Sequence, residues 1–366
     1  MMRVLIIGAY GHFGRYISRA LATNSKIKLI LTGRSLAKAE ALACQLNASN
    51  PIISTALDIS KDFSNALTTL TPDLVIHTSG PFQGQDYTVA EACINHGCHY
   101  LDLADGREFV SGISCLHQRA LNEGVAVISG ASTVPCFTAA LLDHYLSHFQ
   151  SLEDAEYGIA TAHALNPGLA TMRAILSYAG KPIKSIKRGD EKWAFGWQGL
   201  YLRPLPGIGW RVFSHCDVPD LTLFPERYPS LKSLRFCASL EVPFLHLGLW
   251  LLSWLVRLGL VQSLSTFAPL MKSVSEWFNW LGSDRSGFYM TLRGVNCQGE
   301  PHKETFTLIA EKGDGLNIPC IPAILIATRL ADGSLTVRGA QPCIGLISLH
   351  DYLSALSKFS ISTNLQ

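Results

Sequence analysis

The sequence predicts an α/β protein: an N-terminal doubly wound parallel sheet, followed by a second α+β domain with a mixed sheet and an apolar helical insertion. Three observations predict this fold class. Over the first ~150 residues, short runs rich in Val, Ile and Leu alternate with helical stretches. The runs are apolar almost throughout, as expected of strands buried on both faces. Beyond residue 150 this alternation stops, and glycine, proline and aromatic residues cluster.

The first domain is expected over residues 1–150, with six parallel strands separated by helices. The strand ranges are 3–8, 27–33, 51–58, 73–80, 99–105 and 125–130. The helix ranges are 12–24, 36–47, 61–70, 86–96, 111–123 and 136–148. Right-handed crossovers between successive strands place helices on both faces of a sheet, so we expect a Rossmann domain.

The second domain is expected over residues 151–317, because all seven tryptophans lie between 193 and 280 and indicate different packing. Three segments have strand-like composition: 156–163, 286–296 and 304–312. Residues 245–281 are helical in pattern apart from Pro269. Residues 318–366 are expected to form helices that return to pack on the first domain.

The composition excludes several classes of protein. Among 366 residues, 30 Lys and Arg oppose 28 Asp and Glu, so the net charge of +2 leaves no basic excess to neutralise nucleic acid. The ten cysteines include no CxxC pair, so neither a metal site nor a redox pair is expected, and the thiols are expected to be reduced. The first residues resemble a strand rather than a secretory signal, so a cytoplasmic location is expected.

A glycine-rich turn, GAYGHFG, follows the first predicted strand and opens the first predicted helix. Small residues at Gly8, Gly11 and Gly14 permit a tight turn, let a pyrophosphate approach the backbone and let the helix pack on the strand. The other candidate cofactor-binding residues in the turn are Tyr10, His12 and Phe13. The alternative is a turn between strand and helix with no ligand.

The second predicted strand ends in LILTGRS, which places Arg34 where an NAD-selective site carries an acidic residue. A guanidinium at this place pairs with a ribose 2′-phosphate, so NADP is the predicted cofactor. Ser35 would add a hydrogen bond, and Asp58 ends the third strand near the expected adenine edge. The alternative is that Arg34 is a solvated loop cation.

A third candidate segment follows the fourth predicted strand. Ser79, Gly80 and Pro81 form a predicted turn, and Phe82 is an aromatic residue placed to flank the nicotinamide. The segment lies at the carboxyl end of a strand beside the topological switch point, where ligands bind in such sheets. The alternative is that these residues only punctuate a loop.

Together these residues resemble the saccharopine dehydrogenase-like NADP-binding family, in its reductase branch. The resemblance rests on GAYGHFG, TGRS, HTSGPF, VAEACINHGCHYLDLADG and ISGASTVP, and covers roughly residues 1–145. It implies NADP binding by Gly8, Gly11, Gly14, Arg34, Ser79 and Gly80. It also implies a two-domain subunit that is often dimeric, so a homodimer is expected. The substrate is not carried over, because aromatic and aliphatic residues dominate the second domain.

The nicotinamide performs hydride transfer, so the protein must orient a substrate and handle one proton. The candidate catalytic residues are Asp102 and Asp105 in HYLDLAD, and His163, near Asn166, in ATAHALNP. The alternative for each is a structural role, such as a helix cap or a satisfied buried histidine. The predicted function is an NADP-dependent oxidoreductase acting on a partly apolar carbonyl or imine small molecule. The alternative is a non-catalytic NADP-binding sensor or scaffold.

One segment of the second domain is unusually apolar. Residues 242–256, VPFLHLGLWLLSWLV, carry no formal charge, and an uncharged run continues from Arg257 to Met271. Such a run falls short of the ~20 residues that span a bilayer, so no transmembrane helix is expected. Three interpretations of 242–271 stay open: an internal core, a subunit interface, or an apolar face that docks on a membrane surface or a lipid.

Overall fold

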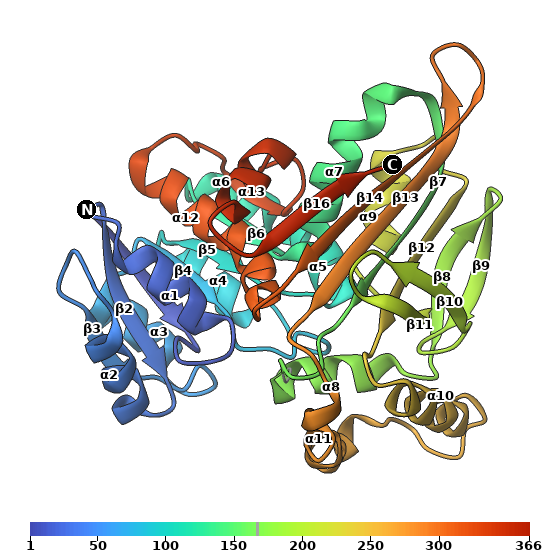
Figure 1. The fold of residues 1–366 in the computed structure, drawn as a ribbon. Helices are drawn as coiled ribbons and strands as arrows, with labels where there is room; N and C mark the ends of the chain where they lie inside the picture. The colour runs from blue at the N-terminus through green and yellow to red at the C-terminus, as the bar shows by residue number, and fades with distance from the viewer. Residues whose placement is uncertain (166–167) are drawn as a thin grey trace. The chain divides into compact units, whose positions relative to one another are not determined.

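The computed structural model describes residues 1–165 and 168–366, and the chain divides into two compact units (Figure 1). The first unit contains Met1–Ala140 and Asn317–Tyr352, and the second contains Leu141–Leu316 and Leu353–Gln366. The first of the boundaries between the two units therefore follows Ala140, whereas the sequence predicts a domain boundary after residue 150. The last residues of the chain belong to the second unit, because they form a strand of its sheet.

A seven-stranded parallel sheet forms the centre of the first unit. Its strand order is β15-β6-β5-β4-β1-β2-β3, and every neighbouring pair is parallel. The strands that the sequence predicts are β1 (Met2–Ile7), β2 (Ile27–Gly33), β3 (Ile53–Ala56), β4 (Leu74–His77), β5 (His99–Asp102) and β6 (Ala126–Ser129). Since the order reverses between β1 and β4, the predicted doubly wound fold is confirmed.

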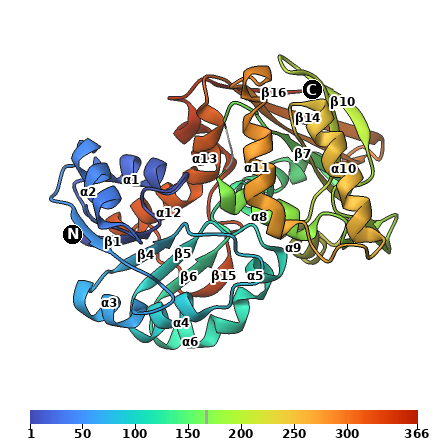
Figure 2. The ribbon, with the colours of Figure 1, turned by 90° about the horizontal axis from the view of Figure 1, so that it is seen from below.

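Helices cover both faces of this sheet. One face carries α1 (Gly14–Ala22) and α2 (Leu36–Gln45), and the other carries α3 (Phe63–Leu70), α4 (Thr88–Asn95) and α6 (His117–Asn122) (Figure 2). Short helices α5 (Arg107–Gly112) and α7 (Thr138–Tyr145) complete the segment. Buried Leu5 and Val75 of the strands pack with Phe63 and Cys93 of the helices. This core holds the carboxyl ends of the strands in fixed positions.

The C-terminal part of the first unit contains a strand that the sequence did not predict. Helix α12 (Ile321–Asp332) contacts α1, and α13 (Leu349–Leu356) begins in the same unit. Between them β15 (Gly339–Pro342) pairs in parallel with β6. Its four residues, Gly-Ala-Gln-Pro, include no β-branched side chain, so composition alone does not indicate a strand.

The second unit contains a mixed seven-stranded sheet, as predicted, with the order β10-β11-β12-β7-β13-β14-β16. The pair of β12 with β7 is parallel and the others are antiparallel. The strands are β7 (Phe149–Ala160), β10 (Tyr201–Leu205), β11 (Gly209–His215), β12 (Ser233–Ser239), β13 (Ser286–Asn296), β14 (Pro301–Ala310) and β16 (Ile361–Leu365). A separate hairpin pairs β8 (Pro182–Lys187) with β9 (Asp190–Phe195).

The helices of the second unit are α8 (Leu169–Tyr178), α9 (Asp220–Arg227), α10 (Pro243–Arg257) and α11 (Ala268–Glu276). The predicted apolar insertion is α10 and α11. Only one side of α10 is buried, through His246, Leu249 and Ser253. The other side of α10 is exposed, so the interpretation of this helix as internal core does not hold for that side. No helix in the described part of the chain is long and apolar enough to cross a membrane.

Candidate functional site

The glycine turn between β1 and α1 has no room for side chains at its glycine positions. Gly8 has a φ of 76°, and a Cβ there would lie 2.5 Å from the Ser79 Oγ. A Cβ on Gly14 would lie 2.2 Å from the Gly8 carbonyl oxygen and 2.8 Å from that of Ala9. These glycines therefore let the turn, the helix and the neighbouring strand end approach one another as a pyrophosphate site requires.

The N-terminus of α1 follows directly from this turn. The Gly11 N–H donates to the Gly8 carbonyl at 2.8 Å, and the Arg15 N–H donates to the Gly11 carbonyl at 3.2 Å. The first N–H groups of a helix have no carbonyl partner within it, and the helix dipole favours negative charge at this end. The N–H groups of residues 12–14, at the start of α1, are thus suited to a pyrophosphate.

The side chains of His12 and Tyr10 also belong to the turn, and only that of Tyr10 has a hydrogen-bond partner among the described residues. The Nε2 of His12 is buried and has no hydrogen-bond partner among the described residues, so it is suited to a ligand atom. Burial, assisted by the charge of Arg15, lowers the pKa of His12, so its ring is neutral at neutral pH. The ring meets that of Phe13 edge-on. The hydroxyl of Tyr10 accepts a hydrogen bond from the Ser35 N–H at 2.9 Å.

The predicted 2′-phosphate site lies at the end of β2. Arg34 is exposed, and Ser35 caps the N-terminus of α2 with its side chain. Asp58 follows β3 and lies 3.8 Å from the Lys61 Nζ. Hydrogen bonds from Ser60, and less strongly the charges of Lys61 and Arg34, lower the pKa of Asp58. The structure thus brings together the cation, the cap and the carboxylate that the sequence assigned to this edge.

The turn after β4 is braced by one side chain. Its Gly80–Pro81 peptide bond is cis. The Gln85 Nε2 donates to the Ser79 carbonyl at 3.1 Å and to the Pro81 carbonyl at 2.7 Å. Sequence reasoning did not single out Gln85, because a glutamine in a loop carries no motif. The bracing gives the predicted turn a defined backbone path beside the glycine turn.

Phe82 is buried, with 4% of its surface exposed. Its ring meets His77 edge-on at 5.1 Å and lies 5.3 Å from Phe109. His77 is itself buried, and its Nδ1 lies 3.1 Å from the Tyr100 hydroxyl. Burial lowers the pKa of His77 to about 4, so the ring is neutral. Phe82 therefore anchors the turn in the core at the carboxyl ends of β4 and β5.

Asp102 ends β5 and is completely buried. Its Oδ1 accepts hydrogen bonds from the Ala104 N–H at 2.9 Å, the Gly130 N–H at 2.8 Å and the Ser129 hydroxyl at 3.0 Å. This carboxylate thereby joins the loop after β5 to the loop after β6. Burial nevertheless raises the pKa of Asp102 to about 6, because it disfavours the charged form more than the donors favour it.

This geometry predicts a pH-dependent contribution of Asp102 to stability. Because its pKa rises from 3.8 to about 6 on folding, the folded chain binds the proton more tightly, and stability is lost as pH rises through this window. The loss amounts to about 3 kcal/mol. Asn at this position still accepts hydrogen bonds but cannot ionise. We expect Asp102→Asn to remove this part of the pH dependence in urea unfolding measured from about pH 4 to about pH 7.

Asp102→Ala serves as the comparison, because it removes the acceptor and leaves three donors without a partner. It is expected to cost about 3 kcal/mol or more at every pH, since each unsatisfied buried donor costs about 1–3 kcal/mol. If the wild type and Asp102→Asn show the same slope of unfolding free energy against pH, the assignment of this titration to Asp102 is wrong.

Asp105 lies in the loop after β5, beside the turn after β4. Its Oδ1 accepts a hydrogen bond from the Gln83 Nε2 at 3.0 Å. A Cβ on Gly106 would lie 3.4 Å from the Gln83 nitrogen, so the two loops pack closely. Burial raises the pKa of Asp105, which keeps its proton to higher pH than an exposed aspartate does.

The third predicted catalytic residue, His163, belongs to the second unit. Its N–H donates to the Glu241 Oε2 at 2.8 Å, and its Nε2 lies 3.0 Å from the Ser275 carbonyl oxygen. Glu241 also accepts hydrogen bonds from Ser283 and pairs with Arg211 at 3.1 Å. His163 is thus held by α11 and by the segment after β12. Its companion Asn166 lies outside the described residues.

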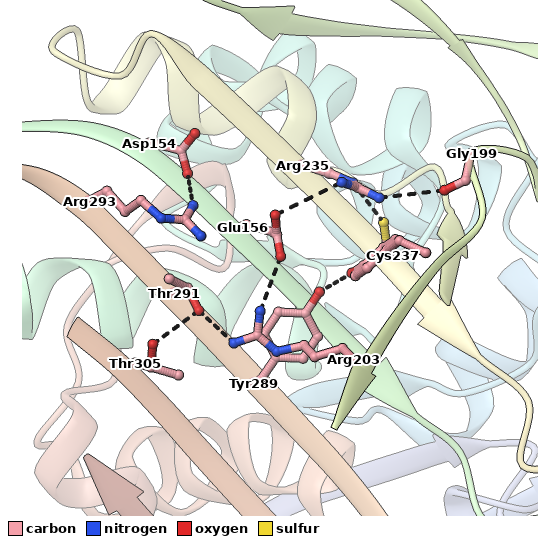
Figure 3. A network of polar contacts seen from close by, with 11 residues as sticks. Asp154, Glu156, Gly199, Arg203, Arg235, Cys237, Tyr289, Thr291, Arg293 and Thr305 are labelled. Carbon is pink, nitrogen blue, oxygen red and sulfur yellow. Dashed lines mark hydrogen bonds and ion pairs between the residues drawn. The ribbon is translucent and has the colours of Figure 1, made fainter. Parts of the chain in front are cut away.

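A polar network that sequence reasoning missed occupies one face of the second unit's sheet (Figure 3). Glu156 on β7 pairs with Arg203 at 3.2 Å and with Arg235 at 3.9 Å. Arg203 stacks on the Tyr289 ring at 3.8 Å, and Arg235 stacks on the Tyr201 ring at 4.0 Å. The two tyrosine hydroxyls are hydrogen-bonded to each other. The network ties β10 to β7, β12 and β13.

The network was missed because its members come from four strands far apart in the sequence. A signal was nevertheless present, since side chains two residues apart in a strand share a face. Each strand carries polar or ionisable residues at this spacing: Asp154 and Glu156, Tyr201 and Arg203, Arg235 and Cys237, and Tyr289, Thr291 and Arg293. This pattern indicates a sheet face that carries ionisable side chains.

The comparison with protein families decides the nature of the first unit. Residues 4–128 match the model of the saccharopine dehydrogenase NADP binding domain. Residues 4–128 of the first unit are thus similar to this NADP-binding domain. The predicted resemblance is confirmed, and so is NADP as the cofactor, because NADP binding defines this domain family. The glycine turn and Arg34 both lie within the matched residues of the NADP-binding domain.

Individual relatives extend the comparison beyond this domain. A probable mitochondrial saccharopine dehydrogenase-like oxidoreductase of Arabidopsis thaliana is 28% identical over a region that covers 44% of this chain and 44% of the relative. The chain thus matches less than half the length of that protein. The apo form of saccharopine dehydrogenase (L-Glu forming) from Saccharomyces cerevisiae has the same fold over the whole chain. Its TM-score is 0.69 at 14% identity, with 100% of both chains covered.

Proposed function

We propose that the protein is an NADP-dependent oxidoreductase that transfers a hydride to or from a small carbonyl or imine compound. The observation that carries this proposal is the glycine turn before α1, whose Gly8, Gly11 and Gly14 leave no room for a Cβ, together with Arg34 at the end of the adjacent strand. The similarity of residues 4–128 to an NADP-binding domain family supports it. The Arabidopsis relative, a probable oxidoreductase, supports the same class of reaction.

The residues of the first unit would divide the binding of NADP among them. The backbone N–H groups of residues 12–14 would bind the pyrophosphate, with the His12 Nε2 beside them. Arg34 and Ser35 would bind the 2′-phosphate. When bound, NADP supplies the hydride carrier, and the protein must still position the substrate and its proton. The braced turn at 79–82 would support the nicotinamide end.

Among the predicted catalytic residues, we propose Asp105 as the group that exchanges a proton with the substrate. Its carboxyl accepts a hydrogen bond from the Gln83 Nε2, and burial favours its protonated form. Asp102 instead accepts three hydrogen bonds at one oxygen, which suits a positioning role. The Nε2 of His163 is engaged with a main-chain carbonyl.

Two measurements on the full chain test the proposed function. Fluorescence titration is expected to show tighter binding of NADPH than of NADH. Oxidation of NADPH in the presence of a library of aldehydes, ketones and imines is then expected to identify at least one substrate. Binding of NADPH without turnover of any member would favour the alternative of a sensor or scaffold. Equal affinity for NADPH and NADH would contradict the assignment of Arg34.

A specific observation favours a second property, contact of residues 243–281, which include α10 and α11, with a membrane surface. Exposed large apolar side chains gather there, including Leu251 (60% exposed), Trp277 (73%) and Trp280 (78%). Soluble proteins rarely leave such clusters uncovered, and tryptophan is enriched where membranes meet water. We propose that this surface docks on lipid.

Sedimentation with phosphatidylcholine–phosphatidylserine vesicles checks this proposal. The wild type is expected to sediment with the vesicles, and Leu251→Glu is expected to reduce the bound fraction about tenfold, because a buried charge opposes insertion. Leu202→Glu, at a leucine that is 63% exposed on β10, is the matched control and should sediment normally. A soluble wild type that forms a dimer through this surface would instead support the predicted homodimer.

A further inference from the structure

Tyr10 contacts both chain neighbours of Arg34. Its ring lies against Gly33, where a Cβ would be 2.6 Å from the Tyr10 Cε1. Its hydroxyl accepts a hydrogen bond from the Ser35 N–H at 2.9 Å. Only a glycine at position 33 leaves room for the ring. Tyr10 therefore fixes the backbone immediately before and immediately after the predicted 2′-phosphate ligand.

The same tyrosine belongs to the glycine turn. The N–H groups of Gly8 and Ala9 both donate to the Thr32 carbonyl at 3.0 Å, so the turn is bonded to the end of β2. On the other side of Tyr10, the Gly11 N–H closes the turn on the Gly8 carbonyl at 2.8 Å. A rigid connection thus runs from the backbone suited to a pyrophosphate to the backbone that carries Arg34.

We propose that Tyr10 is a positioning residue that gives the site its preference for NADPH over NADH. This inference rests on the proposed binding of NADP at Arg34. In NADPH a single ribose joins the pyrophosphate to the 2′-phosphate, so the distance between these two groups is nearly fixed. Both groups can contact the protein at once only when the glycine turn and the backbone at Arg34 keep a matching separation. A preorganised link supplies this condition without an ordering cost at binding. NADH has no 2′-phosphate, so its affinity does not depend on the position of Arg34.

The test uses Tyr10→Phe in the full chain, which keeps the ring against Gly33 and removes the acceptor for the Ser35 N–H. Fluorescence titrations with NADPH and with NADH are compared. We expect the affinity for NADPH to fall about three- to tenfold, the usual consequence of losing one hydrogen bond, and that for NADH to change less than about twofold. Tyr16→Phe, on α1, is the matched control and should keep the wild-type ratio of the two affinities.

A double-mutant cycle separates positioning of Arg34 from a general structural role. Arg34→Ala is expected to lower the affinity for NADPH about tenfold or more, because a charge-assisted contact is lost. In that background Tyr10→Phe should change the affinity less than about twofold, since it acts through Arg34. Equal effects of Tyr10→Phe in both backgrounds, or an unchanged ratio in the single variant, would overturn the role of Tyr10. An unchanged ratio in Arg34→Ala would instead overturn the proposed cofactor site itself.

Discussion

Replacing Gly14 by alanine is expected to reduce the affinity for NADPH by about two orders of magnitude or more, a loss of about 3 kcal/mol. The added Cβ would lie 2.2 Å from the Gly8 carbonyl oxygen and 2.8 Å from that of Ala9. Both atoms belong to the backbone, so a rotamer change cannot relieve the overlap, and the turn must move away from α1. The pyrophosphate site is lost with it. Isothermal titration with NADPH measures the effect.

Gly248→Ala is the matched control for this substitution. Gly248 lies within α10, and a Cβ there meets nothing within 4 Å. Alanine at this position is expected to leave the affinity for NADPH unchanged and to raise the unfolding free energy by about 0.5–1 kcal/mol, because glycine is a poor helix former. If Gly14→Ala binds NADPH as tightly as the wild type, the phosphate does not lie at this turn.

Replacing Asp105 by asparagine is expected to lower kcat about 10²- to 10⁴-fold, the usual contribution of a general acid or base. Asparagine keeps an oxygen that accepts from the Gln83 Nε2 but has no proton to exchange. The affinity for NADPH should stay within about twofold of the wild type, since Asp105 is not assigned to the cofactor. Steady-state kinetics with a substrate identified in the carbonyl and imine library measures the change in kcat. Titration with NADPH measures the change in cofactor affinity separately.

The pH profile adds a second test of Asp105. Because burial raises its pKa, the protonated carboxyl persists to higher pH, and wild-type reduction should slow as pH rises past that pKa. The slowing should be absent from the residual activity of Asp105→Asn. Asp86→Asn alters an exposed aspartate in the neighbouring loop and should have no effect on kcat. A kcat in Asp105→Asn within about threefold of the wild type would exclude Asp105 as the proton donor.

The first unit could be predicted from sequence because its local signals agree with its tertiary structure. The run at 74–77 is buried on both faces, so hydrophobicity alone marks it as a central strand. Gly14 is required by contacts close in sequence, within the turn itself, whereas the close contact at Gly8 is with Ser79 after β4. The strand β15 escaped prediction because its pairing with β6 arises from the tertiary fold, not from its own residues.

The catalytic assignment depended on contacts that sequence does not reveal. Asp102 and Asp105 are three residues apart and look equivalent in HYLDLAD. Tertiary structure separates them, because Asp102 meets Ser129 and Gly130 from β6 and its loop, whereas Asp105 meets Gln83 from the turn after β4. The Glu156 network on the second unit's sheet likewise forms only when four distant strands align.

A crystal structure of the chain with NADP⁺ tests the central claim most directly. The account predicts pyrophosphate oxygens at the N–H groups of residues 12–14 and the 2′-phosphate within hydrogen-bond distance of Arg34. A nucleotide bound away from the glycine turn, or one whose 2′-phosphate faces solvent away from the guanidinium of Arg34, would contradict it.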